Sequence, residues 1–577
     1  MLYHLKNLII LTIVLSVFTT FSQERENDTI DTDVVNVVKP YTPAISDAFK
    51  VKETPTLDDK EISVKKEVKY NIFSIPVAST FTPAKGKAAD VDKAKKEKLF
   101  DNYASVGVGT YTTILGELYL NHSINSTESV GGYINHHSSQ GGIDGLLLDD
   151  GFSDSKINVN YKNSLNTYSW NVEAGYQNQN FNWYGIDQSV YDQNTANTID
   201  PKHQFNTAHF GAEINFDSAI INDGSFLFRR FSDDQGSGEN RLIVKSNFNF
   251  DIGDYELDTD IKIDYLGGSF DRNYLTIDEL NYGNIQLGFA PSYQIKEKDF
   301  TVDFGATIYY FNDTELDKNK FYIYPNIKAS YRLVDDILIA YGGVGGDLIQ
   351  NSYYGFTQEN PFISPTLTIM PTNQQYNAFI GLKGKLSNSM SYNLRGRFYN
   401  EKNKALYKNN IAYINPIDEE DYFYGNSFGV FYDDVTTLNL FGELNVDVNR
   451  DFTLGIKAEY FAYDSDVEPE TWNLPDFKGS LFMDYQIDKH WFMGANLYYV
   501  GERRDELNIV DGLNTTTDQV ILDSYFDANA HLGYKINDMF SVYAKANNIA
   551  NQDYQRYLNF PVQSIQFLAG ATYKFDF

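Results

Sequence analysis

The last fourteen residues of the chain alternate between apolar and polar side chains and end on an aromatic residue. The apolar positions are Ile565, Phe567, Ala569, Ala571, Tyr573, Phe575 and Phe577, and the polar ones are Ser564, Gln566, Gly570, Thr572, Lys574 and Asp576. Only Leu568 interrupts the pattern. Because successive side chains of a β-strand point to opposite faces, the alternation predicts a strand with one apolar and one polar face.

The same period of two returns along the rest of the chain. It is nearly unbroken over 526–536, and it recurs over 438–448 and 452–460 with charged side chains on the polar face. Charges on one face of strand after strand predict a wet interior. Further strands are expected near 104–111, 113–124, 129–137, 156–161, 169–184, 204–216, 241–252, 256–265 and 285–295. The count is about 21, whereas single-chain bacterial barrels have even strand numbers. Either a strand in 226–231 is missing from the count or one strand is counted twice, and we expect roughly 20–22 strands.

The composition favours a membrane barrel over membrane-spanning helices. Tyr (44) and Phe (41) are abundant, as expected for pleated strands and for aromatic girdles at both membrane interfaces. Mean hydropathy is −0.41, and beyond the N-terminal apolar run no segment approaches the roughly 18 apolar residues of a spanning helix. Only helices and closed barrels satisfy every backbone group in lipid. The predicted fold class is therefore all-β, a transmembrane antiparallel β-barrel.

Connections of two sizes separate the predicted strands. Short polar turns lie at 297–299, 335–336, 387–389, 449–451, 488–489 and 537–538, and longer polar loops at 353–374, 402–421, 464–475, 502–523 and 551–563. Outer-membrane barrels have short periplasmic turns and long extracellular loops. If the last strand ends at the periplasm, every one of these short turns falls on that side, provided that 427–448 is one long strand.

The N-terminus has the features of a secretory signal peptide, expected at residues 1–22. Lys6 supplies a positive charge, 8–18 is an apolar core, and Thr20-Phe21-Ser22 is a small-x-small cleavage site. We expect cleavage between Ser22 and Gln23. The alternative interpretation of the apolar run is a buried helix of a cytosolic fold.

Export would leave a periplasmic N-terminal arm or linker at 23–101, partly disordered, ahead of a barrel at 102–577. The stretch 84–98 is charged and rich in Ala, which is typical of a linker or a short helix. The chain has no Cys, which excludes a lipid anchor at the cleavage site, disulfides and Cys-ligated metals.

The chain is strongly acidic, with 47 basic and 78 acidic residues and a formal net charge of −31. Acidic side chains on outer loops and in the lumen would account for this charge, and selectivity for cations or sugars is the alternative. Nucleic acid is not an expected partner, because phosphate backbones bind clustered Lys and Arg.

No catalytic, cofactor-binding or metal-binding set of residues emerges, so we expect neither an enzyme nor a cofactor. His136 and His137 stand beside Ser138 and Ser139, but adjacent strand residues point to opposite faces and cannot serve one site. The pairs Arg229-Arg230 and Arg503-Arg504 could bind an anionic sugar or a lipopolysaccharide phosphate, and we favour solvated or interfacial charges. The acidic runs at 149–150, 233–234 and 419–421 lack the interleaved spacing of calcium ligands and are interpreted as solvated loops.

A set of strand and loop patterns fills the C-terminal hundred residues, at Leu522 to Asp527, His531 to Ile536, Val542 to Ile549, Asn551 to Tyr554 and Phe567 to Phe575, with a weaker one at Leu497 to Arg504. Together these patterns resemble the end of TonB-dependent receptors. It implies a Gram-negative outer-membrane barrel, in contact with lipid and lipopolysaccharide, that takes part in uptake or passage of a solute. Outer-membrane barrels also share a terminal strand that ends on an aromatic residue, which makes Tyr573, Phe575 and Phe577 the expected signal for the barrel-assembly machinery.

The N-terminus departs from this family. A barrel of roughly 22 strands usually holds a plug, and the stretch between the expected signal peptide and Asn102 is too short for the plug of a TonB-dependent receptor. Asp31, Thr32, Asp33, Val34 and Val35 form a weak TonB-box candidate, through which the arm could contact a TonB-type or other periplasmic partner. Two alternatives to transport stay open: a plugless structural or accessory barrel that anchors a larger complex, and an outer-membrane hydrolase.

Overall fold

The computed structural model describes residues 99–577 except 218–219, 253–254, 415 and 417–419. The expected signal peptide, almost all of the N-terminal arm, the TonB-box candidate and Glu419 lie outside the described residues. In the described part, no helix is long and apolar enough to cross a membrane.

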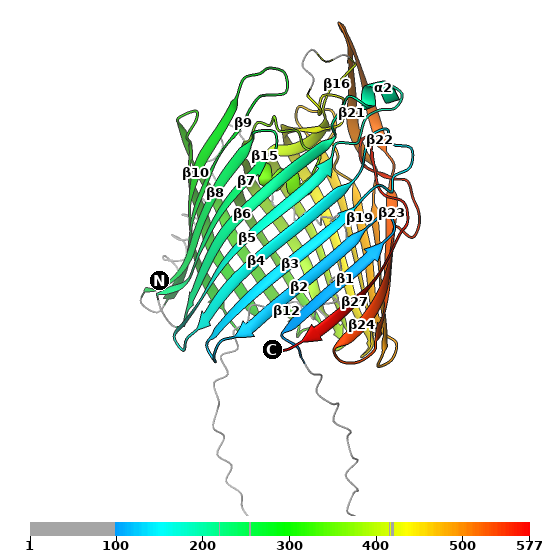
Figure 1. Ribbon diagram of the computed structural model, residues 1–577. Coiled ribbons are helices and arrows are strands. Elements are labelled where there is room, and N and C mark those ends of the chain that lie inside the picture. Colours follow the sequence, from blue (N-terminus) through cyan, green and yellow to red (C-terminus); the bar gives the residue numbers. More distant parts are fainter. Residues whose placement is uncertain (1–98, 218–219, 253–254, 415, 417–419) are drawn as a thin grey trace, which may run out of the picture.

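A closed antiparallel sheet of 22 strands forms the wall, because β1 pairs with β2 on one side and with β27 on the other (Figure 1). Its first half comprises β1 (Asn102–Gly109), β2 (Ile114–Ser123), β3 (Glu128–Ser139), β4 (Phe152–Ser164), β5 (Tyr168–Asn182), β6 (Lys202–Phe216), β7 (Ile221–Asp233), β8 (Gly238–Ile252), β9 (Tyr255–Phe270), β10 (Leu280–Lys296) and β11 (Phe300–Asp313). Its second half comprises β12 (Lys318–Val334), β13 (Leu338–Ile349), β14 (Thr372–Ser387), β15 (Met390–Asn409), β17 (Phe428–Asn449), β18 (Phe452–Ser465), β19 (Phe477–Gln486), β20 (Trp491–Val500), β23 (Tyr525–Lys535), β24 (Phe540–Asn547) and β27 (Gln566–Phe575).

Smaller elements lie in the connections between wall strands. They are the helices α2 (Gln193–Ala196) and α3 (Tyr353–Glu359), the three-stranded sheet of β16 (Ala412–Tyr413), β21 (Arg503–Asp511) and β22 (Asn514–Leu522), and the pair β25 (Gln555–Tyr557) and β26 (Phe560–Pro561). The β21–β22 hairpin stands above the wall at the end that carries the long loops (Figure 1).

The strand count confirms the predicted barrel, and β7 is the strand that was missing from the periodicity. The expected single strand at 427–448 is confirmed as β17. Two expected loops are partly wrong, since β15 continues to Asn409 and 502–523 folds into the β21–β22 hairpin. In β15 the register against β17 shifts between Glu401 and Lys404, and Asn403 has φ 51°. Such a bulge interrupts the alternation, which hides the continuation of the strand.

The two faces of the wall follow the predicted alternation. In β1, Val106 and Val108 are 65% and 67% exposed on the outer face, whereas Ser105 between β2 and β27 is 3% exposed on the inner face. In β27, Phe567 and Tyr573 are exposed, and Leu568 points inward against Leu115 and Tyr543. The single irregularity in the C-terminal pattern is therefore a contact inside the barrel. An apolar outer band and a polar lumen are the arrangement that lipid demands.

The junction between the first and last strands is tied from inside. The hydroxyl of Thr572 donates to Ser105 Oγ at 3.1 Å, and Ser105 Oγ lies 3.3 Å from the hydroxyl of Tyr543. These bonds add to a register that runs from Asn102 paired with Phe575 to Gly109 paired with Leu568. The barrel thus has no free edge at its closing seam.

Candidate functional site

Long loops from all around one rim converge on the mouth of the barrel. By the layout of outer-membrane barrels, the short turns are periplasmic and this rim is extracellular. We call the converging segments the mouth cap: 140–151, 183–201, 271–279, 350–371, the described residues of 410–427, and 548–565. They share one buried core with residues of the upper wall.

Three aromatic side chains in the mouth cap show that the loops cross the opening. Tyr184 lies between β5 and β6, Phe362 between β13 and β14, and Phe560 between β24 and β27, points spread around the whole ring of strands. Phe362 and Phe560 stack with centroids 3.9 Å apart, and Tyr184 lies 5.5 Å and 5.0 Å from them. Because these loops leave the rim at distant points, their contact places them over the mouth.

Hydrogen bonds also join loops from distant parts of the rim. Tyr191 donates to the carbonyl oxygen of Tyr413 at 2.9 Å, and Tyr274 donates to that of Ile411 at 2.9 Å. An ion pair joins Arg272 and Glu420 at 2.8 Å. The segment 410–427, which leaves between β15 and β17, is thereby fastened to loops on the other side of the barrel.

Helix α3 carries the cap down onto the inner wall. Ser352 caps the helix by accepting a hydrogen bond from the backbone N–H of Gly355 at 3.0 Å. Tyr353 is fully buried against Phe231 and Phe270, with centroids 5.1 and 4.9 Å away. A short capped helix is thus packed through Tyr353 against β7 and β9.

A buried carboxylate receives the first turn of α3. Glu239 on β8 is 1% exposed, and its Oε2 accepts from the backbone N–H of Tyr353 at 2.7 Å and from the hydroxyl of Tyr282 at 3.0 Å. At the other end of α3, Glu359 accepts from the hydroxyl of Tyr407, and burial raises the pKa of Glu359 above its usual range. Both ends of the helix are therefore anchored to polar groups of the wall.

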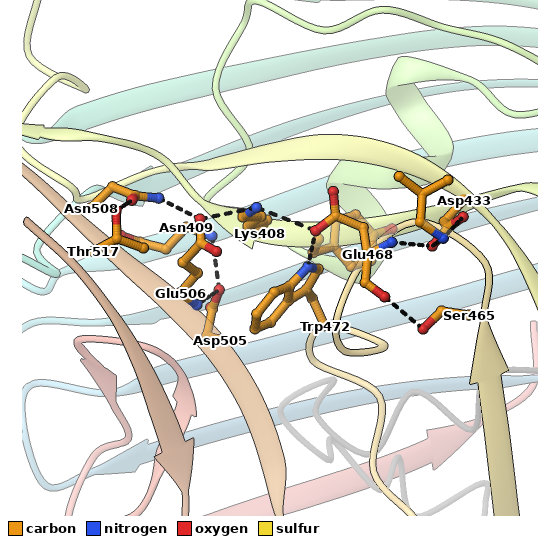
Figure 2. Close-up of polar contacts among 12 residues, drawn as sticks. Lys408, Asn409, Asp433, Ser465, Glu468, Trp472, Asp505, Glu506, Asn508 and Thr517 are labelled. Atoms are coloured by element: carbon orange, nitrogen blue, oxygen red, sulfur yellow. Dashed lines mark hydrogen bonds and ion pairs between the residues drawn. The ribbon is translucent and has the colours of Figure 1, made fainter. Parts of the chain in front are cut away.

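A second polar network fixes the outer rim where the β21–β22 hairpin rises (Figure 2). Lys408 at the end of β15 pairs with Glu506 at 3.0 Å and with Glu468 at 3.3 Å, and its Nζ lies 5.2 Å from the ring of Trp472. Trp472 donates to Glu468 Oε2 at 2.6 Å. One lysine therefore joins β15, the β18–β19 loop and β21.

Asp505 is the most enclosed carboxylate of this network and is fully buried. Its oxygens accept from the backbone N–H groups of Asn409 at 3.0 Å and Glu506 at 2.9 Å, and from the side-chain amide of Asn473 at 2.8 Å. Burial raises the pKa of Asp505 to about 6, against the opposing effect of these donors and of Lys408. The carboxyl group of Asp505, at the base of the β21–β22 hairpin, therefore titrates between mildly acidic and neutral pH.

The histidines point to opposite faces, as expected from strand geometry. His137 faces the lumen at the position paired with Asp154, whereas the ring of His136 lies 2.8 Å from the hydroxyl of Ser155 on the outer face. They do not form one site. The described residues hold no group of three or more His, Cys, Asp or Glu that could bind a metal ion.

The arginine pairs separate in the same way. Arg229 lies inside, 3.7 Å from the ring centroid of Tyr354, and Arg230 is exposed on the outer face. Arg504 is bonded to Glu470 at 2.6 Å. Arg503 is buried, and it donates to the carbonyl oxygens of Gln555 and Arg556. The expectation of a solvated charge is wrong for Arg503, because the β25–β26 hairpin folds over it.

The mouth cap is the feature that sequence reasoning missed. The long loops are expected to be polar, but those of the cap are rich in aromatic residues, as in Trp183-Tyr184 and Tyr422-Phe423-Tyr424. This enrichment was the available signal, since aromatic residues in loops bury large areas when they find a partner. The lumen below the cap is polar: Arg241 and Lys262, for example, share Asp264 at 2.7 and 3.0 Å.

The residues of the expected assembly signal line up at the periplasmic end of β27. The rings of Tyr573 and Phe575 lie 5.6 Å apart, and those of Phe575 and Phe577 lie 5.5 Å apart. Phe577 itself is 79% exposed.

No protein-family model and no curated protein matches the sequence. Solved structures do match the fold. The chain is similar to the ferric-catecholate import receptor Fiu from Escherichia coli K12, with a TM-score of 0.61 and 12% identity over 83% of this chain and 82% of that one. It is also similar to the ferripyoverdine receptor of the outer membrane of Pseudomonas aeruginosa, with a TM-score of 0.60 and 14% identity over 83% and 72%.

A third match is the copper transporter OprC, with a TM-score of 0.57 and 11% identity over 83% of this chain and 82% of that one. Sequence identities at this level speak for the architecture alone. Residues 99–577, apart from the gaps given above, contain no plug domain inside the wall. Together, the closed wall of 22 strands and these matches show that the chain has the barrel fold of the TonB-dependent receptors of the outer membrane.

Proposed function

We propose that this protein is an outer-membrane transport barrel that lets a solute pass when its mouth cap opens. The observation that carries the proposal is the aromatic contact among Tyr184, Phe362 and Phe560, which covers a polar lumen with the chain's own loops. A packed cap over a wet interior is the arrangement of a gate. The fold shared with two receptors and a copper transporter supports transport as the activity.

Opening such a cap requires work, because its aromatic core loses its burial when the loops separate. We assign this work to a periplasmic partner of the TonB type. After signal-peptide cleavage between Ser22 and Gln23, this partner would bind the arm at Asp31 to Val35 and exert a force on the arm from the periplasm. Deleting 31–35 should abolish uptake while leaving the amount of barrel in the outer membrane unchanged.

Swelling of proteoliposomes in small sugars and amino acids tests the gate. Wild-type protein should leave the liposomes nearly impermeable. The double variant Tyr184→Ala, Phe560→Ala removes two of the three rings that meet over the mouth and should make them permeable. Liposomes that stay impermeable with this variant, although the barrel is folded, would argue against a lumen that solutes can cross.

A scaffold is the second candidate function. It is favoured by the β21–β22 hairpin, which stands above the wall on the Lys408 network and exposes Leu513 fully at its tip. A fixed projection of this kind suits the display of a binding surface. Removal of 505–520 should then abolish assembly with a cell-surface complex and leave liposome permeability unaffected.

A further inference from the structure

The periplasmic half of the lumen has one basic sector. Segments 324–334, 338–345, 377–387 and 390–399, which belong to the adjacent strands β12, β13, β14 and β15, contain no Asp or Glu. In a chain with 78 acidic and 47 basic residues, such a stretch of wall is unusual. We call its cations the basic sector: Lys328, Arg332, Lys383, Lys385, Arg395 and Arg397.

The strand register places these cations on the lumen side. Their neighbours Ile380, Leu382 and Leu394 are exposed on the outer face, so the alternate positions point inward. Arg395 is paired with Gly381 on one side and with Phe441 on the other, within the inward set. The sector is therefore a strip of positive charge inside the barrel and close to its periplasmic end.

Aromatic rings of the inner wall hold the cations in place. Lys383 Nζ lies 5.3 Å from the centroid of Tyr341, and the guanidinium of Arg395 lies 5.1 Å from that of Phe441. Arg397 lies 5.2 Å from the ring of Tyr399. Rings attract cations without neutralising them, so the positive charge of Lys383 and Arg395 stays available to a ligand.

Two members of the sector lack a counter-ion among the described residues. Among the described residues no ion pair forms with Lys383 or Arg395, and Arg395 Nε is buried with no hydrogen-bond acceptor. Elsewhere in the lumen, cations such as Arg241 and Lys262 share Asp264. Carboxylates on the two flanking strands have other partners. Glu443 on β17 pairs with Lys457 at 3.3 Å, and Asp303 on β11 accepts from Gln294 at 2.7 Å.

We propose that the basic sector binds a small anionic solute that carries carboxylate or phosphate groups. A guanidinium with a free, buried N–H next to an ammonium group matches the oxygens of these groups in geometry and charge, and rings of Arg and Lys select anions in pores. The proposal rests on the proposed function, since the ligand is the solute that crosses the lumen. It names anions, in contrast to the cation or sugar selectivity that the net charge alone would suggest.

Calorimetric titration of the full-length protein in detergent tests the binding. The probes are citrate for carboxylates and inorganic phosphate for phosphate, at low ionic strength so that screening is weak. The site lies in the periplasmic half, so binding does not depend on opening of the cap. Wild-type protein should bind at least one probe, and Lys383→Gln, Arg395→Gln should weaken that binding about tenfold or more, since two charge-assisted contacts are lost.

The matched control neutralises two lumen lysines on the opposite side of the ring. Lys156→Gln, Lys162→Gln on β4 also removes two positive charges and should change the affinity less than about twofold if the effect is local. If both double variants weakened binding of the probe equally, the effect would come from the general electrostatic potential of the lumen, and the proposed site would be overturned. Absence of binding of both probes to the wild type would also overturn it.

Ion selectivity separates failure of this inference from failure of the proposed function. In a planar bilayer under a KCl gradient, the variant Tyr184→Ala, Phe560→Ala should conduct and prefer chloride, and the added Lys383→Gln, Arg395→Gln changes should shift the reversal potential towards potassium. A conducting barrel that prefers potassium in both forms would leave the gate intact and reject the anion site. A silent barrel that still binds citrate or phosphate would reject the gate and retain the site.

Discussion

The side-chain amide of Asn426 donates a hydrogen bond to the carbonyl oxygen of Trp183 at 2.9 Å. Asn426 precedes β17 and Trp183 follows β5, so this bond joins loops that leave the rim on nearly opposite sides of the barrel. Neither residue is more than 1% exposed. Asn426 also donates to the carbonyl oxygen of Asp421 at 2.9 Å. One buried amide thus holds together the loops that cover the lumen.

Replacement of this amide should loosen the cap. Asn426→Ala takes this donor from the buried carbonyl oxygen of Trp183 and from the partly buried one of Asp421, and we expect the cap to lose about 1–3 kcal/mol of stability. Thermolysin added to intact cells should then cut the cap loops faster than in the wild type. Asn514→Ala, at the exposed start of β22, is the control and should not change cleavage of the cap loops. Equal resistance of wild type and Asn426→Ala would contradict the central role of the amide.

A single methyl group should also disturb the aromatic contact. A Cβ added at Gly185 would lie 2.5 Å from Cδ2 and 2.6 Å from Cζ of Phe560, so that Phe560 must move. Overpacking of this kind costs about 1–3 kcal/mol. Gly185→Ala should produce transient openings in single-channel recordings where the wild type is silent. Gly116→Ala, whose Cβ would meet nothing within 4 Å, is the control; openings in both variants, or in neither, would reject the explanation.

Stability at the root of the hairpin should depend on pH through Asp505. Its pKa is raised to about 6 from 3.8, so the folded state binds the proton more tightly than the unfolded state. The contribution of Asp505 to the free energy of unfolding is fully present below about pH 4 and is lost as the pH rises through 6. For this pKa shift it amounts to at most about 3 kcal/mol.

Hydrogen exchange of the β21 amides checks this dependence. The amides should be better protected at pH 4.5 than at pH 7.5, after correction for intrinsic exchange rates. Asp505→Asn should remove most of the difference, and Asp518→Asn on the exposed strand β22 should retain it. A difference of the same size in Asp505→Asn would assign the effect to another group.

Deletion of Phe577 should impair assembly more than stability. The closing strand pairs with β1 only as far as Phe575, and the exposed ring of Phe577 contacts little besides Phe575 and His122. We therefore expect a melting temperature close to that of the wild type but less barrel in the outer membrane, measured by heat-modifiable migration in gels. Deletion of Phe575 to Phe577 should lower both. A normal yield without Phe577 would argue against the assembly signal.

The wall of the barrel could be predicted because its physics is local. Each strand has a lipid face and a wet face, so a period of two in the sequence reports both. The strand β7 was expected at 226–231 only from the even strand number, because Phe226, Leu227 and Phe228 are apolar on consecutive positions and hide the alternation, with Leu227 turned inward. The bulge at Glu401 and Lys404 hid the end of β15 for a related reason, since it shifts the register between the two faces.

The mouth cap could not be predicted in the same way, because its contacts join residues far apart in the chain. Tyr184 and Phe560 meet only when the ring of strands has closed, and no local period encodes that meeting. Arg395 shows the same limit in the lumen: its place in a basic sector depends on which strands are neighbours. Sequence patterns predicted which face each side chain takes, and the topology decided which side chains share a site.

Access to the lumen from outside is the most direct test of a closed mouth. The chain has no Cys, so a single Asn160→Cys change on the inner face of β4 gives one reactive thiol below the cap. With a membrane-impermeant maleimide on intact cells, we expect little labelling at Asn160→Cys and rapid labelling at Leu513→Cys on the exposed hairpin tip. Adding Tyr184→Ala, Phe560→Ala should make Asn160→Cys reactive. If Asn160→Cys reacts as fast as Leu513→Cys with the cap unaltered, the mouth is open and the gate does not exist.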